Sequence, residues 1–260
     1  MQTLRSRDQT RIAYETSGEG PALVLVNGAL SDRSAFVPLR PLLEAHFTLF
    51  AYDRRGRGDS GDTPPYAPER EIEDLAAVVE AAGAPAFVFA HSSGAILALR
   101  AATSGVPMRK LAVNEPPFIL PGTRPVPSPE LAGRIADRIA ASDREGALRV
   151  FLVEQVGLPP PAFDGLKASP LWPRMIAMAH TVVYDSEIAG DSALPVASLA
   201  KLALPTLVLN GTASFPWIAE TARALVRALP NAEAVHLEGQ PHSPAPDVLA
   251  PALLRFFLPR

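Results

Sequence analysis

The sequence predicts an α/β protein with a mostly parallel central sheet, helices on both faces and a helical cap inserted between two late strands. Three observations predict this fold. Short apolar runs alternate with amphipathic helical patterns, which is typical of parallel strands joined by crossover helices. The alternation stops between residues 115 and 200, where only helices and loops are predicted. The chain has 260 residues, of which 48% are hydrophobic, enough for the core of one large domain.

Seven short segments have the composition of strands. The first, Arg11–Thr16, is predicted to be a half-buried strand that ends before the turn residues Gly18 and Gly20. The others are mostly continuous apolar runs, as expected for strands covered on both faces of a sheet. The predicted strands are residues 11–16, 22–26, 47–52, 85–90, 109–114, 206–210 and 234–237.

Amphipathic helices are predicted in the intervals between these strands. One helix begins at Pro68, carries Ile72, Leu75 and Val79 on one face, and ends at Gly83. A later helix has the same spacing in Ile218, Ala222, Leu225 and Leu229. These apolar faces are expected to cover the sheet.

The segment without strands is predicted to be a separate helical unit. Ser128 precedes a first-turn proline as an N-cap does, and Ser142–Glu145 has the spacing of a capping box. Because this insertion lies between two sheet strands, we expect it over their carboxyl ends, where ligands bind in open α/β sheets. The predicted organisation is a core of residues 1–114 and 201–260 with a cap of residues 115–200.

The segment Ala90–Gly94 joins an apolar strand to an apolar helix and places Ser92 on the turn between them. Small residues two positions before and after this serine allow a sharp turn that exposes its hydroxyl. The pattern is the nucleophile elbow G-x-S-x-G, with Ala90 in place of the first glycine. The alternative is an ordinary loop with two serines, but the strand and helix on either side are the context that the motif requires.

The composition excludes several classes of function. A net charge of −3 without a basic run gives no reason to expect a nucleic acid or an anionic membrane as partner. The absence of cysteine excludes disulfides, thiol catalysis and zinc–thiolate sites. No cluster of metal ligands occurs, and Gly56–Arg57–Gly58 is too short for a phosphate loop and lacks a Walker lysine. We therefore expect a small-molecule substrate, no metal and no cofactor. The oligomeric state has no sequence signal.

No targeting segment is predicted. The stretch Met1–Asp8 contains Arg5 and Arg7 and lacks the apolar region of a signal peptide. No apolar segment has the length needed to span a bilayer. We expect a cytoplasmic protein.

Besides the elbow and the insertion, three loops have informative sequences. They are Val26–Ala29, with Asn27 where a histidine is common, Tyr52–Ser60, which is rich in arginine, and Leu237–His242, which carries a late histidine. With these loops, the order of elements resembles the α/β-hydrolase fold family in its capped serine-hydrolase branch. The resemblance covers nearly the whole chain.

The resemblance implies that Ser92 is a nucleophile and that a histidine takes its proton. His242 follows the last predicted strand and completes the Ser…His order of the family. His91 is expected to point away from Ser92, because adjacent side chains on a turn diverge. Surface, cap and strand positions are expected respectively for His46, His180 and His236.

The acid that orients the histidine departs from the common pattern. The family usually has an aspartate at the position of Ser214, which here is expected to cap a helix beginning near Pro216. Some relatives place the acid earlier, after the strand that follows the elbow helix, where this chain has Glu115. We predict Glu115 as the acid. The alternatives are a site without an acid, in which Glu115 is a hinge residue, and the weaker candidates Asp53 and Asp247.

The oxyanion hole is predicted to consist of the backbone N–H groups of Ser93 and Ala29. Asn27 either holds this loop by hydrogen bonds or reaches the site. Apolar residues of the cap are expected to form the substrate pocket. The candidate pocket residues are Asn27, Phe118, Phe151, Trp172, Met175, His180 and Trp217.

The predicted function is that of a serine hydrolase acting on a small, largely apolar carboxylic ester, lactone or related acyl compound. A carboxylate nucleophile, as an epoxide hydrolase or dehalogenase needs, is not present at position 92. Two alternatives remain: a non-hydrolytic enzyme of the same fold (a lyase, cyclase or cofactor-free oxygenase) and a non-catalytic small-molecule receptor.

Overall fold

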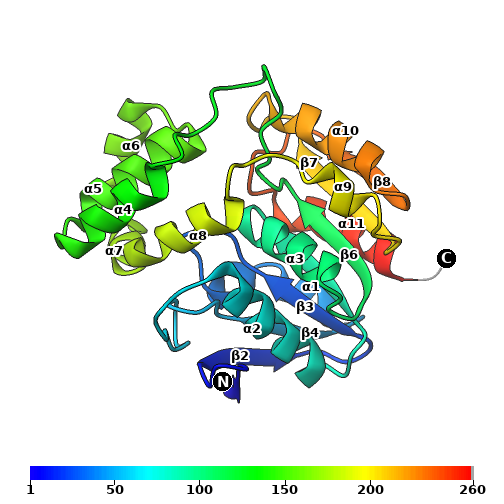
Figure 1. Ribbon diagram of the computed structural model, residues 1–260. Helices are drawn as coiled ribbons and strands as arrows, with labels where there is room; N and C mark the ends of the chain where they lie inside the picture. The colour runs from blue at the N-terminus through cyan, green and yellow to red at the C-terminus, as the bar shows by residue number, and fades with distance from the viewer. Residues whose placement is uncertain (259–260) are drawn as a thin grey trace.

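An eight-stranded sheet with the order β1-β2-β4-β3-β5-β6-β7-β8 forms the centre of the computed structural model, which describes residues 1–258 (Figure 1). From β4 to β8 neighbouring strands are parallel, while β1 pairs with β2 and β2 with β4 in antiparallel fashion. The prediction of a mostly parallel sheet is confirmed. The strands are β1 (Gln2–Arg5), β2 (Arg11–Ser17), β3 (Ala22–Val26), β4 (Thr48–Tyr52), β5 (Ala86–His91), β6 (Met108–Asn114), β7 (Thr206–Gly211) and β8 (Ala232–Leu237).

Strand β1 was not predicted from the sequence. Its four residues are exposed or half-exposed, so no apolar run marks them. The strand exists because its backbone pairs with β2, with Leu4 opposite Ile12. At the opposite edge, β8 begins two residues before its predicted start and is also largely exposed. Both differences occur at the edges of the sheet, where burial gives the weakest pattern.

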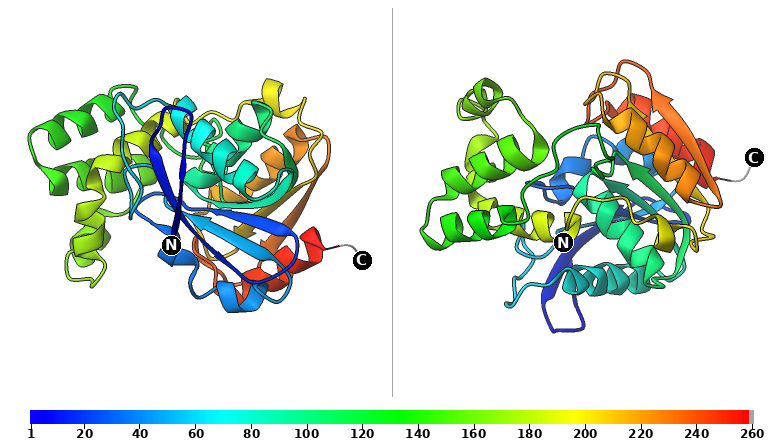
Figure 2. Two further views of the ribbon diagram at one scale, coloured as in Figure 1. Left: turned by 90° about the horizontal axis from the view of Figure 1, so that it is seen from below. Right: turned by 45° about the horizontal axis from the view of Figure 1, so that its top comes forward.

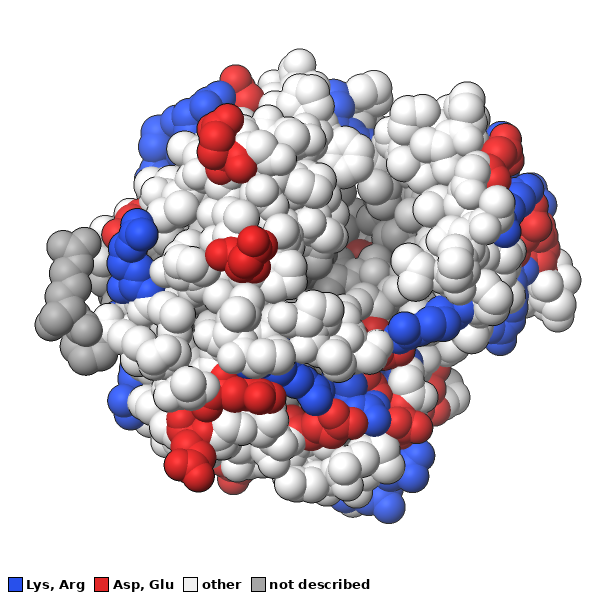
Figure 3. Space-filling view, turned by 180° about the vertical axis from the view of Figure 1, so that it is seen from behind, with Lys and Arg blue, Asp and Glu red and all other residues white. Residues whose placement is uncertain are grey.

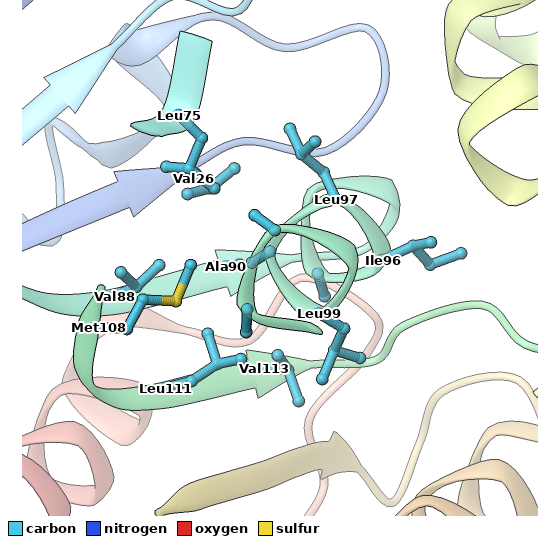
Figure 4. Packing of buried hydrophobic residues seen from close by; sticks show 14 of the residues in the cluster. Val26, Leu75, Val88, Ala90, Ile96, Leu97, Leu99, Met108, Leu111 and Val113 are labelled. Atoms are coloured by element: carbon cyan, nitrogen blue, oxygen red, sulfur yellow. The ribbon is translucent and has the colours of Figure 1, made fainter. Parts of the chain in front are cut away.

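Helices cover both faces of the sheet. Side chains alternate along each strand, so Val24 and Val26 of β3 face one layer while Leu23 and Leu25 face the other. The first layer contains α2 (Pro68–Ala81), α3 (Ser93–Thr103) and α10 (Ile218–Ala228), and the second contains α1 (Arg40–Leu43) and α11 (Pro246–Phe257). Figure 4 shows part of the first layer, where α3 lies over β5 and β6.

The segment between β6 and β7 contains helices but no strand. We call its helical segments the inserted helices; two of them, η2 and η3, are respectively a π-helical and a 3₁₀ turn. They are α4 (Leu131–Ala140), α5 (Arg144–Arg149), η2 (Val150–Val156), α6 (Pro160–Leu166), α7 (Trp172–Ala177), η3 (Ala179–Thr181), α8 (Val182–Ala189) and α9 (Val196–Leu199). Helices α4 to α7 lie to one side of the sheet, and α8 leads back towards α3 (Figures 1 and 2).

The inserted helices have an apolar core of their own. It contains Leu131 and Ile135 of α4, Leu148 of α5, Phe151 of η2 and Phe163 of α6. Burial of these side chains away from the sheet explains why the helical periodicity in this segment is visible in the sequence. No helix within residues 1–258 combines the length and the apolar character needed to cross a bilayer.

Two predicted helix caps differ in the structure. Ser128 does not cap α4, which begins at Leu131 with Glu130 at the cap position. The cap of α5 is Asp143 rather than Ser142, and its carboxylate accepts a hydrogen bond of 2.8 Å from the N–H of Gly146. Asp and Ser are both good capping residues, and two in succession leave the sequence ambiguous by one position.

Buried ion pairs join α8 to the core. Asp185 of α8 accepts hydrogen bonds from Arg57 at 2.8 Å and from Arg54 at 2.9 Å, and all three side chains are almost fully buried. Burial acts to raise the pKa of Asp185, but Arg57 and then Arg54 outweigh it and lower the pKa below its usual range. Arg54 also pairs with Glu71 of α2 at 2.6 Å. The two arginines and the two carboxylates therefore balance one another's charge in the protein interior.

Replacing Asp185 with asparagine should destabilise the protein by about 3–5 kcal/mol, because two buried arginines lose their compensating charge. Urea unfolding followed by circular dichroism measures the change. The matched control is Glu154→Gln, which breaks an exposed ion pair with Arg134 and should cost less than about 1 kcal/mol. Equal losses for the two variants would contradict the role given to Asp185.

Candidate active site

Ser92 stands on a sharp turn between β5 and α3. Its backbone has φ 56° and ψ −126°, a conformation that L-residues rarely adopt. The N–H of Ser92 donates to the carbonyl of Asn114 at 2.9 Å, which fixes the turn against β6. A Cβ atom at Gly94 would lie 2.2 Å from the carbonyl oxygen of Asn27, so a glycine is required there. Ala90, at the other small position of the motif, is fully buried.

Three side chains from different parts of the chain form a continuous hydrogen-bonded series. Ser92 Oγ lies 3.1 Å from His242 Nε2, and His242 Nδ1 lies 2.5 Å from Glu115 Oε2. The Glu115 side chain is fully buried, whereas that of His242 is 32% exposed. The structure therefore brings together the three residues that the sequence analysis selected as nucleophile, base and acid.

Glu115 is held by donors from the end of β7. The N–H of Gly211 donates to Oε1 at 2.8 Å, and the hydroxyl of Ser214 donates to Oε2 at 2.6 Å. Ser214 is not the N-cap expected from the sequence, because α10 begins at Ile218 with Trp217 at its cap position. The position at which the family usually has an aspartate here carries a donor to a carboxylate from the neighbouring strand.

Asp53, one of the weaker acid candidates, has a different role. Its carboxylate accepts hydrogen bonds of 2.8 Å from the N–H groups of Arg33 and Asp59, and it pairs with the Arg33 side chain. It thus anchors the arginine-rich loop Tyr52–Ser60. Asp247, the other candidate, lies in the first turn of α11.

The loop that follows β3 passes beside the elbow. Arg54 donates to the carbonyl of Asn27 at 3.3 Å, and Arg57 donates to the carbonyl of Gly28 at 2.7 Å. The N–H groups of Ala29 and Ser93, the predicted oxyanion hole, make no hydrogen bond within residues 1–258, and both residues line the cavity described below. The amide nitrogen of Asn27 is buried and likewise has no partner among these residues.

A cavity of about 360 Å³ opens on Ser92 and His242. Figure 3 shows the hollow between the inserted helices and the core, with mostly uncharged residues around it. Three predicted pocket residues, Asn27, Phe151 and Trp217, line it. Apolar residues that the sequence analysis did not select also line it: Phe36, Leu39, Phe89, Phe215 and Leu249. These come from four separate segments of the chain, so no local pattern identifies them as pocket residues.

The structure corrects four pocket assignments. Phe118 is 3% exposed and packs in the core against the sheet. Trp172 and Met175 pack on the apolar core of the inserted helices, with the Trp172 ring centroid 5.8 Å from that of Phe163. His180 lies 3.8 Å from Asp62, outside the cavity. Helical spacing alone does not distinguish residues that fill a helix bundle from residues that face a ligand.

The ring of His91 lies beside that of His242. Its ring centroid is 4.7 Å from that of His242, and its Nδ1 lies 2.9 Å from Asn114 Nδ2. The same Asn114 nitrogen donates to the backbone carbonyl of His242 at 3.1 Å. Burial, with a smaller effect of the nearby His242, lowers the pKa of His91 to about 3. His91 is therefore neutral near pH 7 and adds no positive charge beside His242.

Comparison with known proteins shows which family the fold represents. The model of the Alpha/beta hydrolase family matches residues 23–252. An alpha/beta hydrolase of Sphaerobacter thermophilus, whose crystal structure is known, is 51% identical and superposes with a TM-score of 0.95, covering 99% of this chain and 100% of that chain.

Two curated proteins are also similar. The pimeloyl-[acyl-carrier protein] methyl ester esterase of Xanthomonas campestris is 29% identical over 256 residues, which cover 92% of this chain and 96% of that protein. The N-formylmaleamate deformylase of Pseudomonas putida is 35% identical over 115 residues, which cover 43% of each chain.

The environment of His91 predicts that its NMR signals show no titration between pH 5 and 8, because its pKa lies at about 3. Since unfolded histidine binds a proton below about pH 6.5 while folded His91 does not, this group should also reduce stability as the pH falls below that value. A His91 titration midpoint near 6.5 would contradict this assignment.

Proposed function

Because the chain belongs to the alpha/beta hydrolase family, we propose that it is a serine hydrolase that cleaves a small, largely apolar carboxylic ester, lactone or related acyl compound. The observation that carries the proposal is the series Ser92–His242–Glu115 at the floor of an apolar cavity. The esterase and the deformylase among its relatives support an acyl substrate, since both names describe acyl hydrolysis.

The first half of the reaction forms an acyl-enzyme. Ser92 Oγ attacks the carbonyl carbon while His242 Nε2 takes the hydroxyl proton. Glu115, bound to Nδ1, stabilises the imidazolium that results. The carbonyl oxygen becomes an oxyanion, for which the N–H groups of Ala29 and Ser93 are the donors. As the carbon–oxygen bond to the alcohol breaks, His242 returns the proton to the leaving alcohol.

The second half hydrolyses the acyl-enzyme. A water molecule donates a proton to His242 Nε2 as its oxygen attacks the acyl carbon, and the carboxylic acid leaves as Ser92 recovers its proton. Two features favour this chemistry over binding alone. The Ser92 hydroxyl lies on the cavity wall within reach of a base, and the neutral His91 leaves His242 free to accept the proton.

We propose that the inserted helices act as a cap over this site. Phe151 and Leu152 of η2 and Asp185 of α8 line the same cavity as Ser92. The cap supplies apolar wall on one side, and Phe36, Leu39 and Leu249 of the core supply it on the other. Such walls favour substrates with an apolar acyl or alcohol part.

A fluorophosphonate probe should label the protein stoichiometrically at Ser92, because only an activated serine attacks such phosphorus centres. Ser92→Ala should remove the label and lower ester turnover by about 10³-fold or more. The control Ser198→Ala alters an exposed serine of α9 and should keep both. Labelling is read by mass spectrometry and turnover with p-nitrophenyl esters of increasing length. An unlabelled wild-type protein, or an active Ser92→Ala variant, would refute the proposal.

Glu115→Gln should keep the fold and lower the turnover number of the best ester by about 10²- to 10⁴-fold, because the imidazolium loses its counter-charge. The control Glu238→Gln removes an exposed carboxylate of the loop that carries His242 and should leave the turnover number unchanged. Circular dichroism checks the fold of each variant.

Adding Ser214→Asp to Glu115→Gln should recover part of the lost rate. The Ser214 hydroxyl lies 2.6 Å from the carboxylate oxygen that contacts His242, so an aspartate there returns a negative charge to the same place. Turnover of Glu115→Gln within a factor of about three of wild type would rule out Glu115 as the acid.

A further inference from the structure

Two charged side chains, Asp185 and Arg124, line the cavity. Asp185 is neutralised by Arg54 and Arg57, with nitrogen–oxygen distances of 2.9 and 2.8 Å. Arg124 has no carboxylate within 4.0 Å among residues 1–258. The wall of the cavity therefore carries one positive charge that the described part of the chain does not compensate.

The protein holds the Arg124 guanidinium in place with groups that carry no net charge. Nη1 donates to the carbonyl of Val156 and Nη2 to that of Gln155, each at 2.9 Å. The guanidinium carbon lies 5.1 Å from the ring centroid of Trp217, a cation–π distance. A Cβ atom at position 157 would lie 3.1 Å from Nη2, so Gly157 leaves room for the side chain. These contacts fix the cation at the cavity wall.

Arg124 keeps its charge in this position. Burial lowers the pKa of Arg124, and no acidic neighbour opposes that effect. Even so, a guanidinium stays protonated in proteins. Of its five N–H donors, two are used by the carbonyls of η2, so others are free for a ligand. A half-buried cation with free donors is a site for an anion.

We propose that Arg124 binds a carboxylate at the end of the substrate remote from the scissile bond. This inference rests on the proposed function and names its substrate class: acyl esters or lactones with an apolar middle and one anionic terminus. A single cation balances one negative charge, which favours a carboxylate over a phosphate dianion. The guanidinium fork also matches the two oxygens of a carboxylate. The apolar lining between Arg124 and Ser92 receives the middle of the substrate.

The test compares matched substrates. Ethyl esters of four- to six-carbon dicarboxylic acids, each with one free carboxylate, are compared with ethyl esters of monocarboxylic acids of the same length. The wild-type kcat/KM should favour the carboxylate ester, mainly through KM. In Arg124→Gln this preference should fall about tenfold or more, since a charge-assisted contact is lost. Arg124→Lys, which keeps the charge without the planar fork, should retain part of it.

Arg134→Gln is the matched control. Arg134 also contacts η2, through Glu154, but it does not line the cavity, so this variant should keep the wild-type preference. If Arg124→Gln lowers kcat/KM for both ester classes equally, Arg124 only supports η2 and Trp217, and the proposal fails. It fails also if the wild-type enzyme shows no preference for the carboxylate ester.

Binding measurements separate this proposal from the proposed function. Calorimetry with Ser92→Ala protein and the monoethyl esters should show tighter binding than with neutral esters, and the difference should disappear in Ser92→Ala/Arg124→Gln. Equal binding of both classes overturns the Arg124 site even if esters are hydrolysed. Carboxylate-dependent binding without Ser92 labelling or turnover supports the Arg124 site while refuting the hydrolase.

Discussion

The parallel pairing of β5, β6 and β7 is the constraint on which the site depends. In the register of the sheet, His91 pairs with Asn114 and Asn114 with Leu209. The residues that follow the paired ends of β5 and β6 are Ser92 and Glu115, so both leave the sheet at the same edge. Neighbouring strands lie about 4.8 Å apart, a span that a glutamate side chain and an imidazole ring can bridge. The register of the strands therefore determines that Ser92 and Glu115 lie close together.

A carboxylate directly after β6 needs an unusual backbone conformation and nearby hydrogen-bond donors. Glu115 adopts φ 51°, an uncommon value for a residue with a side chain, at the point where the chain leaves the sheet. Its two oxygens accept from Gly211 and Ser214, so the negative charge is solvated by protein groups while the side chain is fully buried. A carboxylate without those donors would be costly to bury. Ser214 thus stabilises the Glu115 carboxylate with a hydrogen bond, although its own side chain carries no charge.

The sequence predicts those features that a local pattern of residues marks, and it misses those that arise only when distant segments pack together. Ser92 lies in a motif with a strand before it and a helix after it, and His242 and Glu115 follow predicted strands, so the sequence could select all three. Phe215 and Leu249 reach the cavity only because distant segments pack together, and helical spacing selected Trp172 and Met175 instead, which fill the core of the inserted helices. Strand β1 was missed because pairing, not burial, creates it. Arg124 gave no signal at all, since an arginine without a carboxylate partner is recognisable only in three dimensions.

The inserted helices differ in whether their polar side chains contact the core. Helix α8 is tied to the core by Asp185, and Arg174 of α7 contacts Asp32 at 2.5 Å. Within residues 1–258, the side-chain hydrogen bonds and ion pairs of α4, α5, η2 and α6 go only to the segment between β6 and β7. Asp185, Arg54 and Arg57 would lose their buried ion pairs if α8 left the core, whereas α4, α5, η2 and α6 are held by contacts within the inserted segment itself.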